Sequence, residues 1–429
     1  MCHLAPTVTY MSTMTQTRHL GRTAHTGPSG RPAHRPRLIS GRLALVLMSS
    51  FGALTSFYLL LSVTPMYAMS AGAGSAEAGL VTGSLMLATV LAEFASARLM
   101  RRFGYRAVFA VGALLLGGPA LALLGPHSVV TIVAVSIARG LGFGLNTVVT
   151  GALVATALPP ERRGEGIGLA GVVSCVPAIV ALPSGVWLAG HTGFAVVIAI
   201  TAVSALAPLA AVPWLAVPAD RQAAQADHGA AQSAGLLASL RSGGALRPSL
   251  VFAATTVSAG VVAAFLPLAA GVSGSVAALG LFAQAVASTA SRWWAGRHGD
   301  RHGHAGLLVP GLLIAAAGMT TLIWVATPAA LIAGMCLFGI GFGITQNVSF
   351  ALLIDRAPAS GYGTASALWN LAYDAGYGAG PAVFGVFVGC TGYPAAFALT
   401  GMLMLAALGP AIRDRRMDVS QGRQDSVSA

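Results

Sequence analysis

The chain has 429 residues, of which 55% are hydrophobic and only 8% are charged. Soluble domains carry roughly 25% charged residues, so this composition excludes an ordinary soluble protein and indicates a membrane protein. The net charge of +12 comes from arginine alone, because the sequence contains no lysine. The arginines are distributed between apolar stretches rather than gathered in one basic segment, which argues against nucleic-acid binding.

The first 40 residues are rich in Arg, His, Pro and Thr and lack the apolar core of a signal peptide. We predict a disordered cytoplasmic tail at 1–40. After it, stretches of about 20 apolar residues recur, which is the length that crosses a bilayer as a helix. We expect an all-α membrane protein with twelve transmembrane helices, at 42–69, 77–99, 105–125, 129–157, 166–190, 194–217, 249–271, 274–295, 306–326, 329–355, 362–388 and 393–411.

The positions of the arginines predict how these helices are oriented. Twenty-three of the 24 arginines lie in the two terminal segments, in the connections after even-numbered helices, or at helix ends beside them. The connections after odd-numbered helices contain none. Positively charged residues stay on the cytoplasmic side, so we expect both termini in the cytoplasm and the chain in the inner (cytoplasmic) membrane.

The second six helices repeat the first six at an offset of 199 residues. The segment "GLGFGL" at 140–145 falls on "GIGFGI" at 339–344, and Arg102 falls on Arg301. Two copies that enter the membrane from the same side are typical of two-bundle transporters. The expected organisation is a six-helix bundle at 41–217, a cytoplasmic linker at 218–248, a second six-helix bundle at 249–411 and a cytoplasmic tail at 412–429.

Related segments follow the second helix of each copy. The second copy reads "GRHGDRHG" from Gly296 to Gly303, and the first reads "ARLMRRFG" from Ala97 to Gly104. With the arginine and glycines of "RGLGFGLN" at 139–146, they resemble signatures of the major facilitator superfamily. The resemblance implies two pseudo-symmetric bundles and a gating loop on the inward face. The gating residues it implies are Arg101, Arg102, Gly104, Gly296, Asp300, Arg301 and Gly303.

The finer resemblance within this family is mixed. The eleventh helix, "ALWNLAYDAGYGAGPAVFG" at 367–385, resembles the exporter branch described as arabinose-efflux-like, close to the drug/proton antiporters. The Gly-Pro ending that marks the fifth helix of antiporters is missing, because Leu182 precedes Pro183. In addition, Arg101 stands where the family's loop has an aspartate, which predicts that the lock of the first copy is weakened or rebuilt.

Three ionisable side chains inside the apolar stretches are candidates for proton coupling: Asp374, Arg139 and Glu93. A charge at the centre of a bilayer costs about 2.5–3.5 kcal/mol on insertion scales, so each one is expected to have a function. The alternatives are an Arg139 bonded to backbone carbonyls and an Asp374 that only joins two helices. For Glu93, the nearby Arg98, Arg101 and Arg102 favour a cytoplasmic ion-pair network. The offset of 199 places Arg292 at the position equivalent to Glu93.

The family resemblance also implies that helices 1, 4, 7 and 10 line a central cavity. The polar residues on these helices are mostly neutral hydrogen-bonding groups with one cation. Such a set fits a small zwitterionic, anionic or moderately polar substrate and does not choose among them. The substrate-binding residues we expect are Arg139, Tyr58, Asn146, Gln346 and Asn347, together with Asn370 of helix 11.

Two motifs that suggest other chemistry have simpler explanations. The histidines of "RHGDRHGH" at 297–304 invite a zinc site, but the repeat already accounts for Asp300 and Arg301, and a short loop gives no scaffold for a catalytic metal. The glycines at 140–144 and 339–343 lie within predicted helices, whereas nucleotide loops follow a strand. Their spacing instead predicts close helix packing. We expect no metal and no cofactor.

These observations predict a secondary active transporter that works by alternating access and exports a small molecule in exchange for protons. Its expected partners are the substrate, protons and the lipid bilayer, and we expect a monomer. The alternative within transport is a proton symporter or facilitator that imports a sugar or organic acid. A membrane-embedded lipid-modifying enzyme is disfavoured, because the sequence shows no catalytic cluster near an interface and no sizeable domain outside the membrane.

Overall fold

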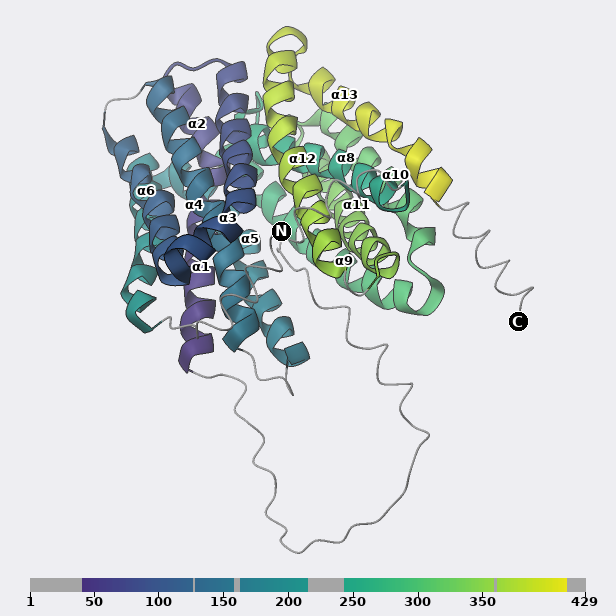
Figure 1. Ribbon diagram of the computed structural model, residues 1–429. Coiled ribbons are helices and arrows are strands. Elements are labelled where there is room, and N and C mark those ends of the chain that lie inside the picture. The colour runs from purple at the N-terminus through teal and green to yellow at the C-terminus, as the bar shows by residue number, and fades with distance from the viewer. Residues whose placement is uncertain (1–40, 126–127, 158–162, 215–242, 359–360, 415–429) are drawn as a thin grey trace, which may run out of the picture.

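The chain folds into two helical bundles that lie side by side, purple to teal and green to yellow in Figure 1. The computed structural model describes residues 41–125, 128–157, 163–214, 243–358 and 361–414. Throughout these ranges the secondary structure is helical, without a strand. Ten of the helical segments are long and apolar enough to cross a membrane. The all-α membrane fold predicted from composition is therefore confirmed.

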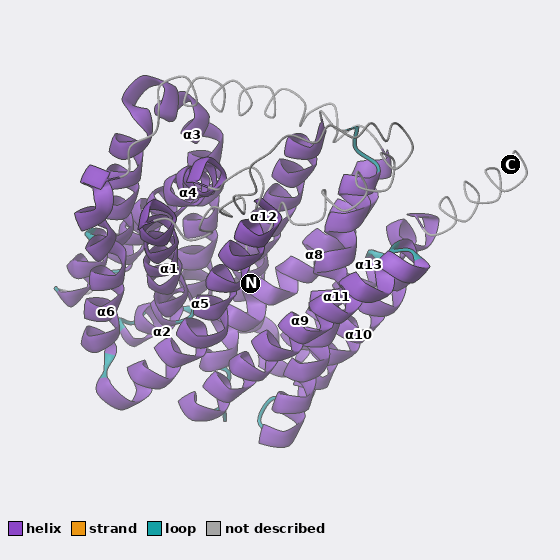
Figure 2. Cartoon of the chain, turned by 90° about the horizontal axis from the view of Figure 1, so that it is seen from below, coloured by secondary structure: helices purple, strands orange, loops and turns teal. Residues whose placement is uncertain are grey.

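The first bundle holds the N-terminal half of the chain, as Figure 2 shows from below. Its first predicted span is broken at Ser62 into two consecutive helices, and its last span ends in a 3-10 helix. The elements are α1 (Gly41–Leu61), α2 (Val63–Ser70), α3 (Ser75–Gly117), η2 (Pro119–Leu124), α4 (Val129–Ala157), α5 (Arg163–Thr192), α6 (Phe194–Leu206) and η4 (Ala207–Trp214).

The second bundle holds the C-terminal half of the chain. Its first helix begins at Gly243, before the predicted end of the linker at residue 248, and most of that linker lies outside the described residues, as does the tail at 1–40. The elements are α8 (Gly243–Phe265), η5 (Leu266–Leu268), α9 (Gly274–His302), η6 (Ala305–Leu307), α10 (Leu308–Thr321), η7 (Leu322–Trp324), α11 (Pro328–Asp355), α12 (Tyr362–Thr391) and α13 (Tyr393–Ala406).

The ten apolar segments are consistent with twelve crossings. The longest of them, Ser75–Leu124, contains two predicted spans, because the backbone at Gly104 leaves the helical region with φ 76°. The other missing span is α12, which is 30 residues long but has no stretch as apolar as those of the ten, because it carries Asn370, Asp374 and several glycines. Both exceptions contain residues that were predicted to be functional, Gly104 in the first and Asn370 and Asp374 in the second.

The repeat is visible in the backbone. Among the residues that the structure describes, each half contains three glycines with positive φ, a conformation that residues with a Cβ rarely adopt. Each of these glycines lies between two helices or at a kink inside one, and its counterpart in the other half is 199 positions away. The pairs are Gly72 and Gly271, Gly104 and Gly303, and Gly193 and Gly392.

Close packing inside each bundle follows the same offset. A Cβ added at Gly142 would lie 2.4 Å from the backbone nitrogen of Leu116, and one added at Gly341 would lie 2.2 Å from that of Ala315. Helices approach this closely only where small residues line the contact. The glycines of "GLGFGL" and "GIGFGI" therefore have the helix-packing role that their spacing predicts.

The two signature segments differ from the expected loops. Ala97–Phe103 belongs to α3 and Gly296–His302 belongs to α9, so both segments are helical, and the gating role of their residues stays a prediction. Each helix continues until the positive φ of Gly104 or Gly303 redirects the chain. The glycine that closes each motif is thus the residue at which the chain turns.

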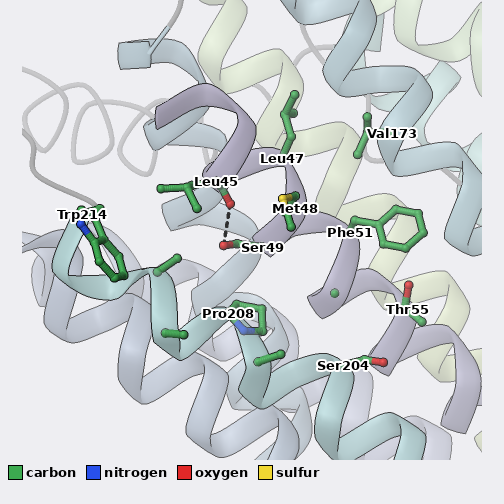
Figure 3. Close-up of a pocket in the computed structure, with 14 residues that line it drawn as sticks. Leu45, Leu47, Met48, Ser49, Phe51, Thr55, Val173, Ser204, Pro208 and Trp214 are labelled. Carbon is green, nitrogen blue, oxygen red and sulfur yellow. Dashed lines mark hydrogen bonds between the residues drawn. The ribbon is translucent and has the colours of Figure 1, made fainter. Parts of the chain in front are cut away.

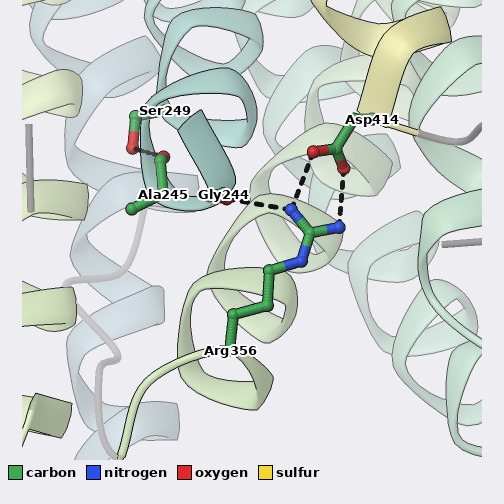
Figure 4. A network of polar contacts seen from close by, with 5 residues as sticks. All are labelled: Gly244, Ala245, Ser249, Arg356 and Asp414. Carbon is green, nitrogen blue, oxygen red and sulfur yellow. Dashed lines mark hydrogen bonds and ion pairs between the residues drawn. The ribbon is translucent and has the colours of Figure 1, made fainter. Parts of the chain in front are cut away.

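An ion pair holds one end of the second bundle together (Figure 4). The Arg356 guanidinium, at the end of α11, donates to both carboxylate oxygens of Asp414, at 2.7 and 2.9 Å, and to the Gly244 carbonyl at 2.9 Å. The Asp414 side chain is 1% exposed, so the Arg356 guanidinium, rather than water, stabilises its negative charge. The contact joins the last described helical turn to the start of α8.

We expect Arg356→Met to lower the free energy of unfolding by about 1–3 kcal/mol, because it leaves a buried carboxylate unpaired. Thermal unfolding of the detergent-purified protein measures the loss. The double variant Arg356→Met/Asp414→Leu should recover most of it, since it removes both charges. A single variant that melts together with wild type would show that the pair contributes nothing to stability.

Candidate functional site

The two bundles meet where α3 packs against α12 (Figure 1). A Cβ added at Gly79 would lie 2.1 Å from the Pro381 carbonyl oxygen, and one added at Gly385 would lie 2.3 Å from the Ser75 carbonyl oxygen. The Ser75 hydroxyl also donates to the Gly385 carbonyl at 2.8 Å. We call the contacts made by Gly79, Gly83, Gly378 and Gly385 the α3/α12 seam. It brings the two backbones into direct contact.

Asp374 lies in α12 one turn before this seam, and its side chain is completely buried. Among the described residues, neither of its carboxylate oxygens meets a hydrogen-bond donor in good geometry. Glycines fix α12 against α8 around it, since a Cβ at Gly380 would lie 2.1 Å from the Val257 carbonyl oxygen. Burying a carboxylate without a donor is costly, so this group needs a proton or a cationic ligand.

Glu93 of α3 interacts with Asp374 across the interface between the bundles. The two carboxyl groups lie within hydrogen-bonding reach, and a bond between them requires a proton on one of them. Arg98, Arg101 and Arg102 lie on exposed positions further along α3. The structure therefore places Glu93 in a carboxyl pair with Asp374 rather than in the cytoplasmic ion-pair network that its neighbours in sequence favoured.

Tyr58 of α1 lies next to this pair. Its hydroxyl hydrogen-bonds with that of Tyr373 and interacts electrostatically with Asp374 and Arg292. Arg292 of α9 donates from Nη1 to Oε1 of Gln346 at 3.4 Å. Glu93 and Arg292 are equivalent positions of the repeat, and they contribute to one group of polar residues from opposite bundles. We call this group the central cluster: Tyr58, Glu93, Arg292, Gln346, Tyr373 and Asp374.

An aromatic stack runs along α12 beside the cluster. Tyr373 stacks on Trp369 and on Tyr377, with ring centroids 6.2 and 5.6 Å apart. Phe252 of α8 stacks on Trp369 at 4.6 Å, and the Trp369 indole donates to the Ser349 hydroxyl at 3.1 Å. The three α12 aromatics recur every fourth residue, so they share one face of the helix.

Arg139 lies inside the first bundle. Its side chain is 1% exposed and donates to two backbone carbonyls, those of Leu116 at 2.6 Å and Ser56 at 2.9 Å. Leu116 belongs to the last turn of α3, where carbonyls lose their helical donors. These contacts are the ones expected of a structural arginine, and they tie α1, α3 and α4 together.

The remaining predicted substrate residues separate into two groups. The Asn146 amide donates to Gly142 of its own helix at 3.1 Å and packs on Gly112, so it lies between α3 and α4. Asn347 lies beside Gly296 of α9, and Asn370 lies one turn before Asp374. Both have a buried side-chain oxygen without a hydrogen-bond donor among the described residues.

The predicted gating residues lie beside the Gly104 kink of α3 and in the last two turns of α9, and none of them belongs to the central cluster. Arg101, Arg102 and Arg301 are exposed. Asp300 is also exposed and lies 3.8 Å from Nε2 of His304, whose Nδ1 is 3.6 Å from Asp355 of α11. A protonated His304 can therefore bridge two carboxylates of the second bundle. No group of three metal-ligating side chains is found within the described ranges.

A cavity of about 600 Å³ opens on the flank of the first bundle (Figure 3). It lies between α1 and η4 and is lined almost entirely by apolar groups. The Ser49 hydroxyl within it bonds to the Leu45 carbonyl of its own helix. None of the predicted site residues lines this cavity, so its apolar lining has no part in the central cluster.

Three residues at the central cluster and its aromatic stack were not predicted from the sequence: Arg292, Tyr373 and Tyr377. Arg292 was noted as the counterpart of Glu93, and that offset was the signal which could have identified it. The two tyrosines follow Trp369 at helical spacing, a pattern that more often indicates packing.

Comparisons with known proteins agree with the fold. A family model described as Major Facilitator Superfamily matches residues 46–381 and 249–424. A crystal structure of a D-xylose-proton symporter is similar with a TM-score of 0.69 and 19% identity, covering 86% of this chain and 97% of that chain. An inward open structure of the xylose transporter XylE from E. coli has a TM-score of 0.66 and 17% identity, covering 86% and 95%.

A crystal structure of a mutant of the peptide transporter POT is also similar, with a TM-score of 0.66 and 19% identity over 87% of this chain and 95% of that chain. At these identities the likeness concerns the fold alone. No curated protein matches the sequence closely enough to count as a relative.

Proposed function

The chain belongs to the major facilitator superfamily and is a membrane transporter rather than an enzyme; from the central cluster we propose that it is a proton-coupled secondary transporter in which Glu93 and Asp374 share the coupling proton. The observation that carries the proposal is the carboxyl pair formed by the completely buried Asp374 and the partly exposed Glu93. It spans the two bundles, and among the described residues no basic side chain lies within 4 Å of either carboxyl.

The position of the pair connects protonation to movement of the bundles. One proton shared by two adjacent carboxylates removes their repulsion and adds a hydrogen bond between the bundles. Rocking of one bundle against the other separates Glu93 from Asp374 and leaves each carboxyl to exchange with water or substrate. Protonation of the carboxyl pair therefore favours the conformation in which the α3/α12 seam is closed. Loss of the proton favours opening of the seam.

We propose export as the direction, with both termini in the cytoplasm and Arg139 as a brace of the first bundle. The resemblance of helix 11 to exporters and the distribution of arginines support this orientation. In it, the α3/α12 seam lies at the outer side of the membrane, because α3 begins and α12 ends there. Import of a sugar or organic acid with protons is the second candidate, favoured by the missing Gly-Pro ending of helix 5.

Everted membrane vesicles test the coupling. Respiration acidifies the vesicle interior, and a panel of amines, sugars and organic acids is added while a fluorescent dye reports the pH gradient. A transported compound should dissipate the gradient with wild type. With Asp374→Asn we expect the response to fall by at least about tenfold, because an amide cannot take up the proton.

Glu77→Gln is the matched control, since Glu77 is an exposed carboxyl in the first turn of the same helix as Glu93. Undiminished dissipation by Asp374→Asn would remove this carboxyl as the coupling group. Accumulation of the compound inside acidified everted vesicles supports export. Accumulation only in right-side-out vesicles with an acidic exterior would establish import.

A further inference from the structure

The central cluster contains more acidic groups than basic groups. Glu93 and Asp374 contribute two carboxyls, whereas the cluster contains one guanidinium, that of Arg292. Arg292 donates to Gln346 and interacts with Tyr58 and Tyr373, and no ion pair within 4 Å joins it to either carboxyl. With all three groups ionised the cluster carries one net negative charge, which one proton or one monovalent cation neutralises.

Arg139, which is buried, does not supply the missing charge. The terminal nitrogens of Arg139 donate to the carbonyls of Leu116 and Ser56, inside the first bundle. Both terminal nitrogens thus bond to backbone carbonyls of α1 and α3. An anionic substrate next to Asp374 would meet the carboxyl pair without this cation to balance it, and like charges in a water-poor site repel strongly.

The side chains next to the pair suit an organic cation. Tyr58 of α1 and Tyr373 of α12 lie next to the pair, Tyr377 stacks on Tyr373, and aromatic faces attract ammonium groups. The Tyr377 hydroxyl is buried without a hydrogen-bond partner among the described residues, as are both oxygens of Asp374. These atoms can accept hydrogen bonds from an N–H donor that the protein does not provide.

We propose that the transported substrate is an organic cation, an amine with an attached apolar or aromatic body, whose ammonium group takes the place of the proton shared by Glu93 and Asp374. The inference rests on the proposed function and adds the class of substrate. One proton leaves the pair as one cation enters, so the charge of the cluster is the same before and after the exchange. Substrate and proton then compete for one site, which is sufficient to couple their movements.

Three indoles of nearly equal shape separate charge from size: tryptamine, a cation at neutral pH; tryptophol, which is neutral; and indole-3-acetate, an anion. Each is titrated calorimetrically into the full-length protein in lipid nanodiscs, in two buffers of different ionisation enthalpy, so that proton release is measured with affinity. We expect tryptamine to bind at least about tenfold more tightly than the other two. Its binding should release about one proton and weaken as the pH falls, because protons fill the same pair.

Glu93→Gln and Asp374→Asn should each weaken tryptamine binding by at least about tenfold, whereas Glu77→Gln should leave it unchanged. Thermal unfolding of each variant verifies that it is folded, and Glu93→Gln serves if Asp374→Asn is not. Equal or tighter binding of tryptophol or indole-3-acetate, binding without proton release, or no binding of any of the three would overturn the substrate class. Flux that depends on Asp374 with sugars or acids alone would overturn it while leaving proton coupling intact.

Discussion

Replacing Gly79 by alanine is expected to drive the transporter out of the conformation described here. The added Cβ would lie 2.1 Å from the Pro381 carbonyl oxygen and 2.9 Å from the Pro381 carbonyl carbon. Both atoms belong to backbone, so no side chain can move aside. Since α3 and α12 come from different bundles, separating the bundles at the α3/α12 seam relieves the clash without unfolding either one.

Overpacking of this kind costs about 1–3 kcal/mol. An energy of this size changes the ratio of two conformations by roughly 5- to 150-fold, because each 1.4 kcal/mol corresponds to a factor of ten. The matched control is Gly83→Ala, one turn along the same face of α3. There the added Cβ would lie 3.1 Å from the Ala382 Cβ and 3.3 Å from the Gly378 carbonyl oxygen, contacts that small adjustments relieve.

Spin labels at Ser70 and Thr391, in a background without the native cysteines, report the distance between the bundles at this end. Both positions are exposed. Wild type and Gly83→Ala should give mainly the short distance, and Gly79→Ala mainly a longer one. A short distance retained by Gly79→Ala, with unchanged thermal stability, would show that α12 bends locally and that the seam does not open by separation of the bundles.

Replacing Arg139 by leucine is expected to damage folding more than substrate affinity. The change removes two hydrogen bonds from a charged donor and leaves the carbonyls of Leu116 and Ser56 without it, at a cost of about 3–5 kcal/mol. We expect low yield and a strongly reduced melting temperature. Arg139→Lys should retain part of the stability, because an ammonium can reach one carbonyl but lacks the planar fork that joins two.

Arg292→Leu is the matched control, since Arg292 is partly exposed and lies in the central cluster. It should melt close to wild type while altering transport. If Arg139→Leu melted as wild type does and weakened only substrate binding, Arg139 would have to contact the substrate in another state of the cycle. The two variants therefore distinguish an arginine that stabilises one bundle from an arginine that belongs to the site.

The candidate site was only partly predictable. Asp374 was identified because a carboxyl within an apolar helix is costly, and that argument needs no coordinates. The partner of Glu93 was not predictable in the same way. Arg98, Arg101 and Arg102 are close in sequence, and the sequence contains no information on which face of α3 meets the other bundle. Arg139 posed the same problem, since its two acceptors are main-chain carbonyls and any helix could supply them.

The helical membrane fold, the repeat and the turns could all be predicted, because these depend on local properties. Hydrophobic length defines a crossing, and glycine permits the positive φ found at Gly104 and Gly303. The pairing of Glu93 with Asp374 became visible only in the folded structure. Their carboxyls belong to different bundles, and contact between residues so far apart in the chain depends on how two folded units pack, which local sequence does not encode.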